Sequence, residues 1–195
     1  LYIQRTNTAR ARIQGSEAAY EVNLPLRRTS ALTFNGTMGW LKGSDLTPDP
    51  NALALINSFY NRSDTPVPLR GSATDAPLAG ITPFRGIFAA RYSDFRRGWF
   101  GEYEARRQSR VTRADPLELS STITTQYGTL ASLGSFTQQS ARFGYDLRRE
   151  SRRMLLTFGV ENLTNRLYFE HFQNAPAPGR TFVLGLTVDL SNLWR

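Results

Sequence analysis

The sequence contains no cysteine, and Lys42 is the only lysine among its 24 basic residues. The absence of cysteine excludes a disulfide framework and thiolate metal sites, and it fits an oxidising envelope compartment without requiring one. Histidine occurs once, at His171, and it has neither a cysteine partner nor HxxxH spacing, so it does not predict a zinc site. Apolar runs fall far short of the roughly 18 residues of a membrane-spanning helix. We therefore expect no metal, no cofactor and no transmembrane helix.

Positive charge exceeds negative charge, which gives a formal net charge of +8 and a pI near 10.4. Such a balance suits nucleic-acid binding only if the basic residues gather on one face. Here many arginines occur in pairs at predicted turns and others alternate along predicted strands; the pairs are Arg27-Arg28, Arg96-Arg97, Arg148-Arg149 and Arg152-Arg153. We expect no nucleic-acid partner.

No group of residues predicts an enzyme. Glu102 and Glu104 could form an acid–base pair, but two positions apart on a strand they share one face. Arg91 or Arg106 would neutralise them there. The simpler interpretation is a charged strand face, so we expect a protein without catalytic activity.

The most informative segment is residues 152–190, where two stretches alternate with a period of two around a polar loop. Such a period places successive side chains on opposite faces of a sheet. An apolar face opposite a face of small and polar residues is typical of a membrane β-barrel wall. With one earlier strand included, the residues predicted to face lipid are Phe143, Tyr145, Leu156, Phe158, Val160, Phe182, Leu184, Leu186 and Val188.

The whole chain reads as all-β, with about seven antiparallel up-and-down strands. The predicted short turns lie at 25–28, 96–98 and 149–151, and they alternate with long loops at 43–82, 112–134 and 165–179. Asp49-Pro50 predicts the start of a short helix within the first long loop. Transmembrane barrels have short periplasmic turns and long extracellular loops, so the alternation predicts which side each connection faces.

Seven strands would leave two open edges, whereas single-chain bacterial barrels close with an even strand number. Open edges leave backbone groups unsatisfied in lipid. Residues 1–12 also read directly as strand rather than as a signal peptide. We therefore expect residues 1–195 to be part of a larger barrel. An independent eight-stranded barrel remains an alternative.

Several ordered motifs resemble TonB-dependent outer-membrane receptors. Residues 162–168 read NLTNRLY and are followed by GRTF at 179–182, similar to the signature that closes these barrels. IQGSE at 13–17 and the junction from APL at 76–78 to ITPF at 81–84 also resemble family segments. The likeness covers about residues 9–190. Family members end on an aromatic residue, whereas here Trp194 is followed by Arg195.

The resemblance implies a barrel of about 22 strands in the outer membrane, filled by the protein's own N-terminal plug domain. It further implies uptake of a scarce small-molecule ligand, such as an iron-siderophore complex or cobalamin, driven by the TonB complex through the plug. This chain would be the C-terminal portion of the barrel, without the plug and the earlier strands. Outer-membrane lipid would surround it.

Three residues near the last predicted loop are candidates for ligand contact: Tyr168, His171 and Arg180. The aromatic residues around His171 favour an outer interface belt instead, and Arg180 is expected to pair with a carboxylate. Two other functions remain open. One is a passive porin or other outer-membrane barrel, and the second is a soluble β-sandwich binding module whose apolar faces would meet across a core.

Overall fold

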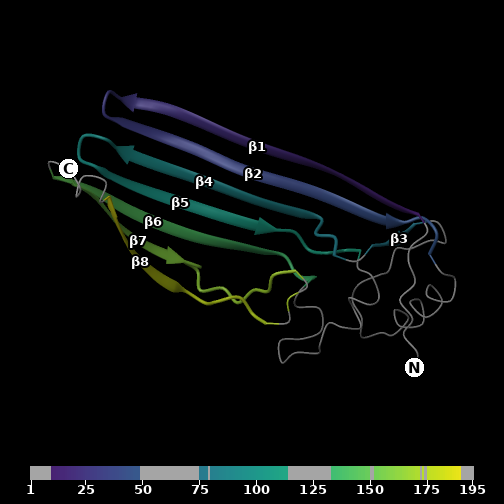
Figure 1. Cartoon of the computed structure of the whole chain (residues 1–195). Coiled ribbons are helices and arrows are strands. Elements are labelled where there is room, and N and C mark those ends of the chain that lie inside the picture. The colour runs from purple at the N-terminus through teal and green to yellow at the C-terminus, as the bar shows by residue number, and fades with distance from the viewer. Residues whose placement is uncertain are drawn as a thin grey trace.

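The computed structural model describes residues 10–48, 75–78, 80–113, 133–149, 152–171, 173 and 175–189. The described strands form a single antiparallel sheet, and consecutive long strands lie side by side (Figure 1). They are β1 (Ala11–Arg27), β2 (Ser30–Asp45), β3 (Ala76–Pro77), β4 (Phe84–Asp94), β5 (Trp99–Gln108), β6 (Phe136–Arg149), β7 (Arg152–Glu161) and β8 (Thr181–Asp189). The all-β prediction and its seven long strands are confirmed; β3 is a short addition to the edge of β2.

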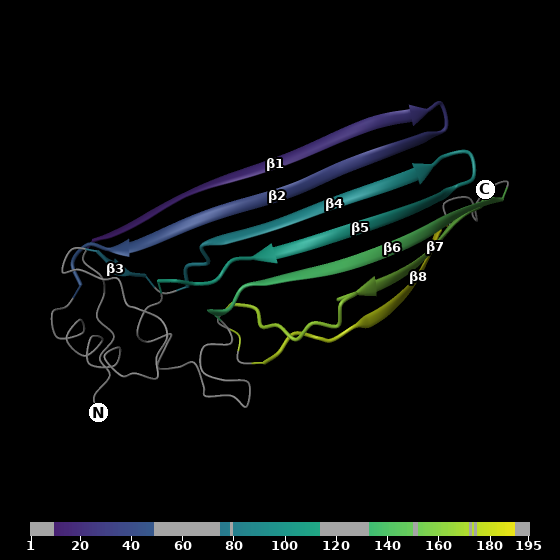
Figure 2. The ribbon, with the colours of Figure 1, turned by 180° about the vertical axis from the view of Figure 1, so that it is seen from behind.

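The sheet is open, because β1 and β8 are its two edges and do not pair with each other. The strand ends that the short connections join, on either side of 28–29, 95–98 and 150–151, all lie at one end of the sheet. The long ones, at 46–83, 109–135 and 162–180, begin and end at the other (Figure 2). The predicted alternation of connection lengths is confirmed. Among the described residues no helix is long and apolar enough to cross a membrane.

The strand register joins the alternating patterns into two continuous faces. Phe143 lies opposite Phe158, which in turn lies opposite Leu184, and similar rows run back to β1. We call this side the apolar face; it contains Tyr20, Val22, Leu24, Leu32, Phe34, Met38, Trp40, Phe88, Tyr92, Trp99, Tyr103, Phe143, Tyr145, Leu156, Phe158, Val160, Phe182, Leu184, Leu186 and Val188. Every residue predicted to face lipid lies on it.

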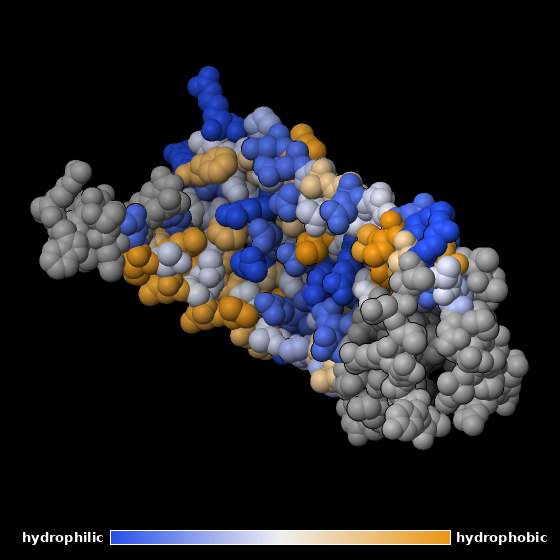
Figure 3. Space-filling view, turned by 45° about the vertical axis from the view of Figure 1, so that its right-hand side comes forward, coloured by the Kyte–Doolittle hydropathy of each residue, from blue (hydrophilic) through white to orange (hydrophobic). Residues whose placement is uncertain are grey.

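The apolar face is exposed. The side chains of Leu184 and Phe158 are 75% and 46% exposed, and among the predicted lipid-facing residues only Val160 is half-buried. Within the described part of the chain no second sheet covers this face. Figure 3 shows hydrophobic residues along the lower left border of the molecule, beside a central region of hydrophilic ones.

The opposite side, which we call the polar face, is more crowded. Phe100 is 9% exposed, and the ring lies directly over Gly144, where a Cβ would overlap it. On the ring itself, the Arg91 guanidinium carbon lies 3.6 Å from the centroid, a cation–π contact. Greater burial on this side than on the apolar face indicates that the sheet curves toward the polar face.

Two predicted boundaries differ from the structure. β1 continues to Arg27, so the turn predicted at 25–28 is wrong for its first three residues. Pro25 is tolerated because β1 is an edge strand and its register shifts between Pro25 and Arg27. β5 ends at Gln108, so the long connection predicted to begin at 112 begins at 109. The helix predicted after Asp49-Pro50 lies outside the described residues.

Candidate functional site

A pocket of about 320 Å³ lies on the polar face of β5–β8. Strand residues form its floor, and Tyr168, from the connection between β7 and β8, closes one side. The charged and hydroxyl groups around it are those of Glu102, Glu104, Arg106, Ser140, Arg142, Glu161 and Tyr168. A polar ligand or a polar protein surface would suit this lining better than an apolar one.

Glu102 is the best neutralised acid of the pocket. One carboxylate oxygen accepts a hydrogen bond from Arg142 at 3.1 Å, and the other lies 3.7 Å from the Arg91 guanidinium. The predicted neutralisation of Glu102 by Arg91 is therefore confirmed, with Arg142 as a second partner. Glu104 has no ion pair among the described residues. A carboxylate is therefore left to interact with whatever enters the pocket.

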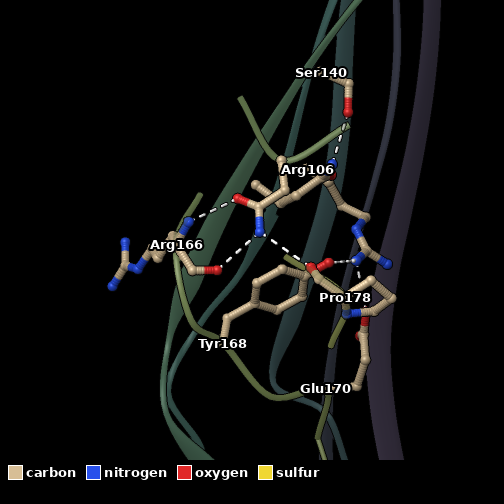
Figure 4. A network of polar contacts seen from close by, with 8 residues as sticks. Arg106, Ser140, Arg166, Tyr168, Glu170 and Pro178 are labelled. Carbon is tan, nitrogen blue, oxygen red and sulfur yellow. Dashed lines mark hydrogen bonds and ion pairs between the residues drawn. The ribbon is translucent and has the colours of Figure 1, made fainter. Parts of the chain in front are cut away.

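Residues 162–180, which we call the strap, turn back over the polar face. Arg106 on β5 anchors the strap: the guanidinium donates to Glu170 Oε1 at 2.6 Å and to the Tyr168 hydroxyl at 3.1 Å (Figure 4). The ring of Tyr168 also packs on Phe136, with 4.3 Å between centroids. Phe136 is 2% exposed, so the strap covers one of the most buried side chains of the sheet.

Asn162 holds the two ends of the strap together. The backbone there has φ near +50°, a conformation that asparagine tolerates better than most residues. The buried side-chain amide donates to the carbonyls of Arg166 and Pro178, and its oxygen accepts from the Arg166 amide (Figure 4). Asn165, also at φ near +50°, accepts from the Arg180 amide. The NLTNR motif is therefore explained by the shape of the strap.

The three candidate ligand residues do not lie together. Tyr168 lines the pocket, whereas His171 and Arg180 do not. Arg180 is exposed, and its guanidinium donates to the carbonyl of Leu163 at 2.7 Å. The expectation that Arg180 pairs with a carboxylate is therefore wrong. Residues of an outer interface belt would be exposed, whereas Tyr168 and Phe169 are both buried. The interpretation of these two aromatic residues as part of such a belt is therefore wrong. A ligand-binding role for the three candidates stays a prediction.

His171 fastens the strap to the first long connection. It is 3% exposed, and Nδ1 lies 3.2 Å from the Thr82 hydroxyl. Burial and, to a smaller degree, the positive charge of Arg85 lower the pKa of His171 to about 4. The imidazole is therefore neutral near pH 7.

A second contact joins the first two long connections. The Arg113 guanidinium donates to Asp75 Oδ1 at 2.7 Å. Hydrogen bonds from Arg113 and then Ser44 hold the pKa of Asp75 below its ordinary value. Together with His171, this contact ties the described parts of all three long connections to one end of the sheet.

Neither a comparison with protein-family models nor a search of curated proteins finds a match for this chain. Among the described residues no group of three or more histidine, aspartate or glutamate side chains could hold a metal ion. The fold and the site define an architecture: an open antiparallel sheet with one exposed apolar face and one polar face that carries a strap-covered pocket.

Proposed function

We propose that the chain is the C-terminal part of the barrel wall of a TonB-dependent outer-membrane receptor, a transporter rather than an enzyme. The observation that carries the proposal is the exposed apolar face, which is continuous across seven antiparallel strands. The resemblance of the motifs at 162–168 and 179–182 supports the family. In the first motif, Asn162 and Asn165 shape the base of the strap.

The dimensions of the apolar face also favour a membrane wall. On β2 its residues run from Leu32 to Trp40, about 26 Å along the strand at the usual rise per residue. A transmembrane strand needs about 9–11 residues. A soluble β-sandwich would bury these side chains against a second sheet, and their exposure argues against that alternative.

In the proposed receptor, the short turns face the periplasm and the long connections face outside. The polar face lines the lumen, where the plug domain and a small-molecule ligand such as a metal chelate would contact it. The pocket beneath the strap places carboxylates and guanidiniums at that surface. The TonB complex would act on the plug, upstream of this wall.

Membrane placement is tested with one substitution on each face of β8. Leu184, in the middle of the strand, is exposed on the apolar face, and Thr187 is exposed on the polar face. In the full-length protein folded into vesicles, Leu184→Arg should cost about 2–4 kcal/mol of folding free energy, the cost of arginine on a lipid face near the bilayer centre. Thr187→Arg should cost much less. Equal, small costs would contradict a lipid-facing Leu184.

Energy-driven uptake is tested separately, because a passive porin would share the wall. Growth of a deletion strain carrying the full-length protein should be measured with ferric siderophores as the iron source and with cobalamin. A receptor supports growth only when the inner-membrane TonB complex is intact. Growth that persists without that complex would favour the porin.

A further inference from the structure

The arginines of the short turns have no part in the proposed transport. Arg28 lies in the β1–β2 turn, Arg96 and Arg97 lie in the β4–β5 turn, and all three are exposed. In the described part of the chain, every ion pair lies elsewhere, on the polar face or between long connections. The turn arginines therefore present positive charge that no carboxylate of the described residues neutralises.

The β4–β5 turn holds its two arginines in a defined position. Asp94 Oδ1 accepts from the backbone amides of Arg96 and Arg97 at 3.0 and 2.9 Å. Gly98, at φ near +72°, closes the turn and accepts from the Asp146 amide. The carboxylate of Asp94 is thus engaged by the backbone, and hydrogen bonds from two sides fix the turn.

The neighbouring hairpin repeats the charge pattern in its register. Arg148 is placed opposite Arg153, and Arg149 opposite Arg152, at the same end of the sheet. The backbone register of this hairpin therefore places four more arginine positions at the short-turn end of the sheet.

Aromatic residues border the same end on the apolar face. Trp99 directly follows the β4–β5 turn, with its ring 5.2 Å from Tyr92 and 6.0 Å from Phe143 between centroids. Phe95, in the turn itself, is 65% exposed. Tyrosine and tryptophan gather at the headgroup level of a bilayer, where an apolar ring meets a polar layer. Cations just beyond such a row lie at the depth of lipid phosphates.

We propose that the short-turn end of the sheet binds anionic phospholipid headgroups, with Arg28, Arg96 and Arg97 as the described ligands of the phosphate. Guanidinium groups match phosphate oxygens with paired, charge-assisted hydrogen bonds. Trp99 and Tyr92 would lie beside the glycerol region of the same lipid. This inference rests on the proposed membrane placement and adds a lipid preference to it.

The test compares lipid preference in paired variants of the full-length protein. The protein is reconstituted in phosphatidylcholine vesicles with and without phosphatidylglycerol, and phosphatidylglycerol retained on purification is measured by native mass spectrometry. Arg96→Gln/Arg97→Gln should weaken the preference about 30-fold, at about 1 kcal/mol per arginine. Arg96→Lys/Arg97→Lys keeps the charge and should keep most of the preference. Because Asp94 contacts backbone amides, these variants leave the turn's hydrogen bonds in place.

Arg10→Gln/Arg12→Gln is the matched control, because it removes two exposed arginines at the opposite end of the sheet. It should leave the preference unchanged. Insertion into both vesicle types with no difference among the variants would overturn the lipid inference alone. Failure of the unmodified protein to insert into either vesicle would overturn the membrane placement and this inference with it.

Discussion

Arg106 is the residue on which the strap most depends, and its removal gives a sharp prediction. Its guanidinium makes an ion pair with Glu170, bonds the Tyr168 hydroxyl, and lies 5.3 Å from the centroid of the Phe136 ring. Hydrogen bonds to charged groups are worth about 1.5–3 kcal/mol. Because the ion pair is about one-third exposed, solvent screening reduces its share to at most about 1 kcal/mol. We expect Arg106→Met to lower the opening free energy of the strap by about 2 kcal/mol.

Amide hydrogen exchange measures this opening directly. A loss of about 2 kcal/mol should speed exchange in residues 163–180 about 30-fold and leave β6 and β7 unchanged. Arg107→Met is the control: it removes the same charge from the next residue, whose side chain bonds Thr137 on β6. If Arg106→Met leaves strap exchange unchanged, or speeds exchange equally in the strands, Arg106 is not a local anchor.

Two further outcomes follow from the described packing. In the folded protein the pKa of His171 is about 4, below the ordinary 6.5. The stability contributed by the neutral imidazole is therefore complete above pH 6.5 and is lost as the pH falls toward 4, so hydrogen exchange should show that the opening free energy of the strap falls by about 3 kcal/mol over this range. His171→Asn should abolish this pH dependence. Gly144→Ala would drive a Cβ into the Phe100 ring, so chemical denaturation should show a loss of about 1–3 kcal/mol. At Gly39 the added Cβ would meet Glu17 at an ordinary 3.5 Å, and Gly39→Ala should be nearly neutral. Equal effects at the two glycines would contradict the close approach.

The strands could be predicted from the sequence because their information is local. A period of two assigns each side chain to a face, and the turn signals set the order of the hairpins. The register then follows, as with Phe158 between Phe143 and Leu184. The predicted turn at Pro25 is wrong because nothing in the local sequence distinguishes an edge strand, where proline is tolerated, from a central one.

The strap could not be predicted in the same way. Arg106 and Glu170 are far apart in sequence, and no spacing rule relates them. His171 is a candidate for ligand contact on its sequence, yet it is buried against Thr82 because the chain after Asn162 folds over the polar face. The motif asparagines were the available signal: residues that tolerate positive φ, followed by glycine and proline, indicate a tightly shaped connection.

The central claim is that lipid contacts the apolar face and water contacts the polar face. Residues 1–195 contain no cysteine, so single cysteines can be introduced there one at a time, in a background where any cysteine elsewhere in the full-length protein is replaced by serine. On β8 the informative positions alternate: Leu184 and Leu186 lie on the apolar face, and Val183 and Thr187 on the polar face. In membranes containing the full-length protein, a water-soluble maleimide should label Val183→Cys and Thr187→Cys and spare Leu184→Cys and Leu186→Cys. Equal labelling at all four positions, or the reverse pattern, would contradict the account.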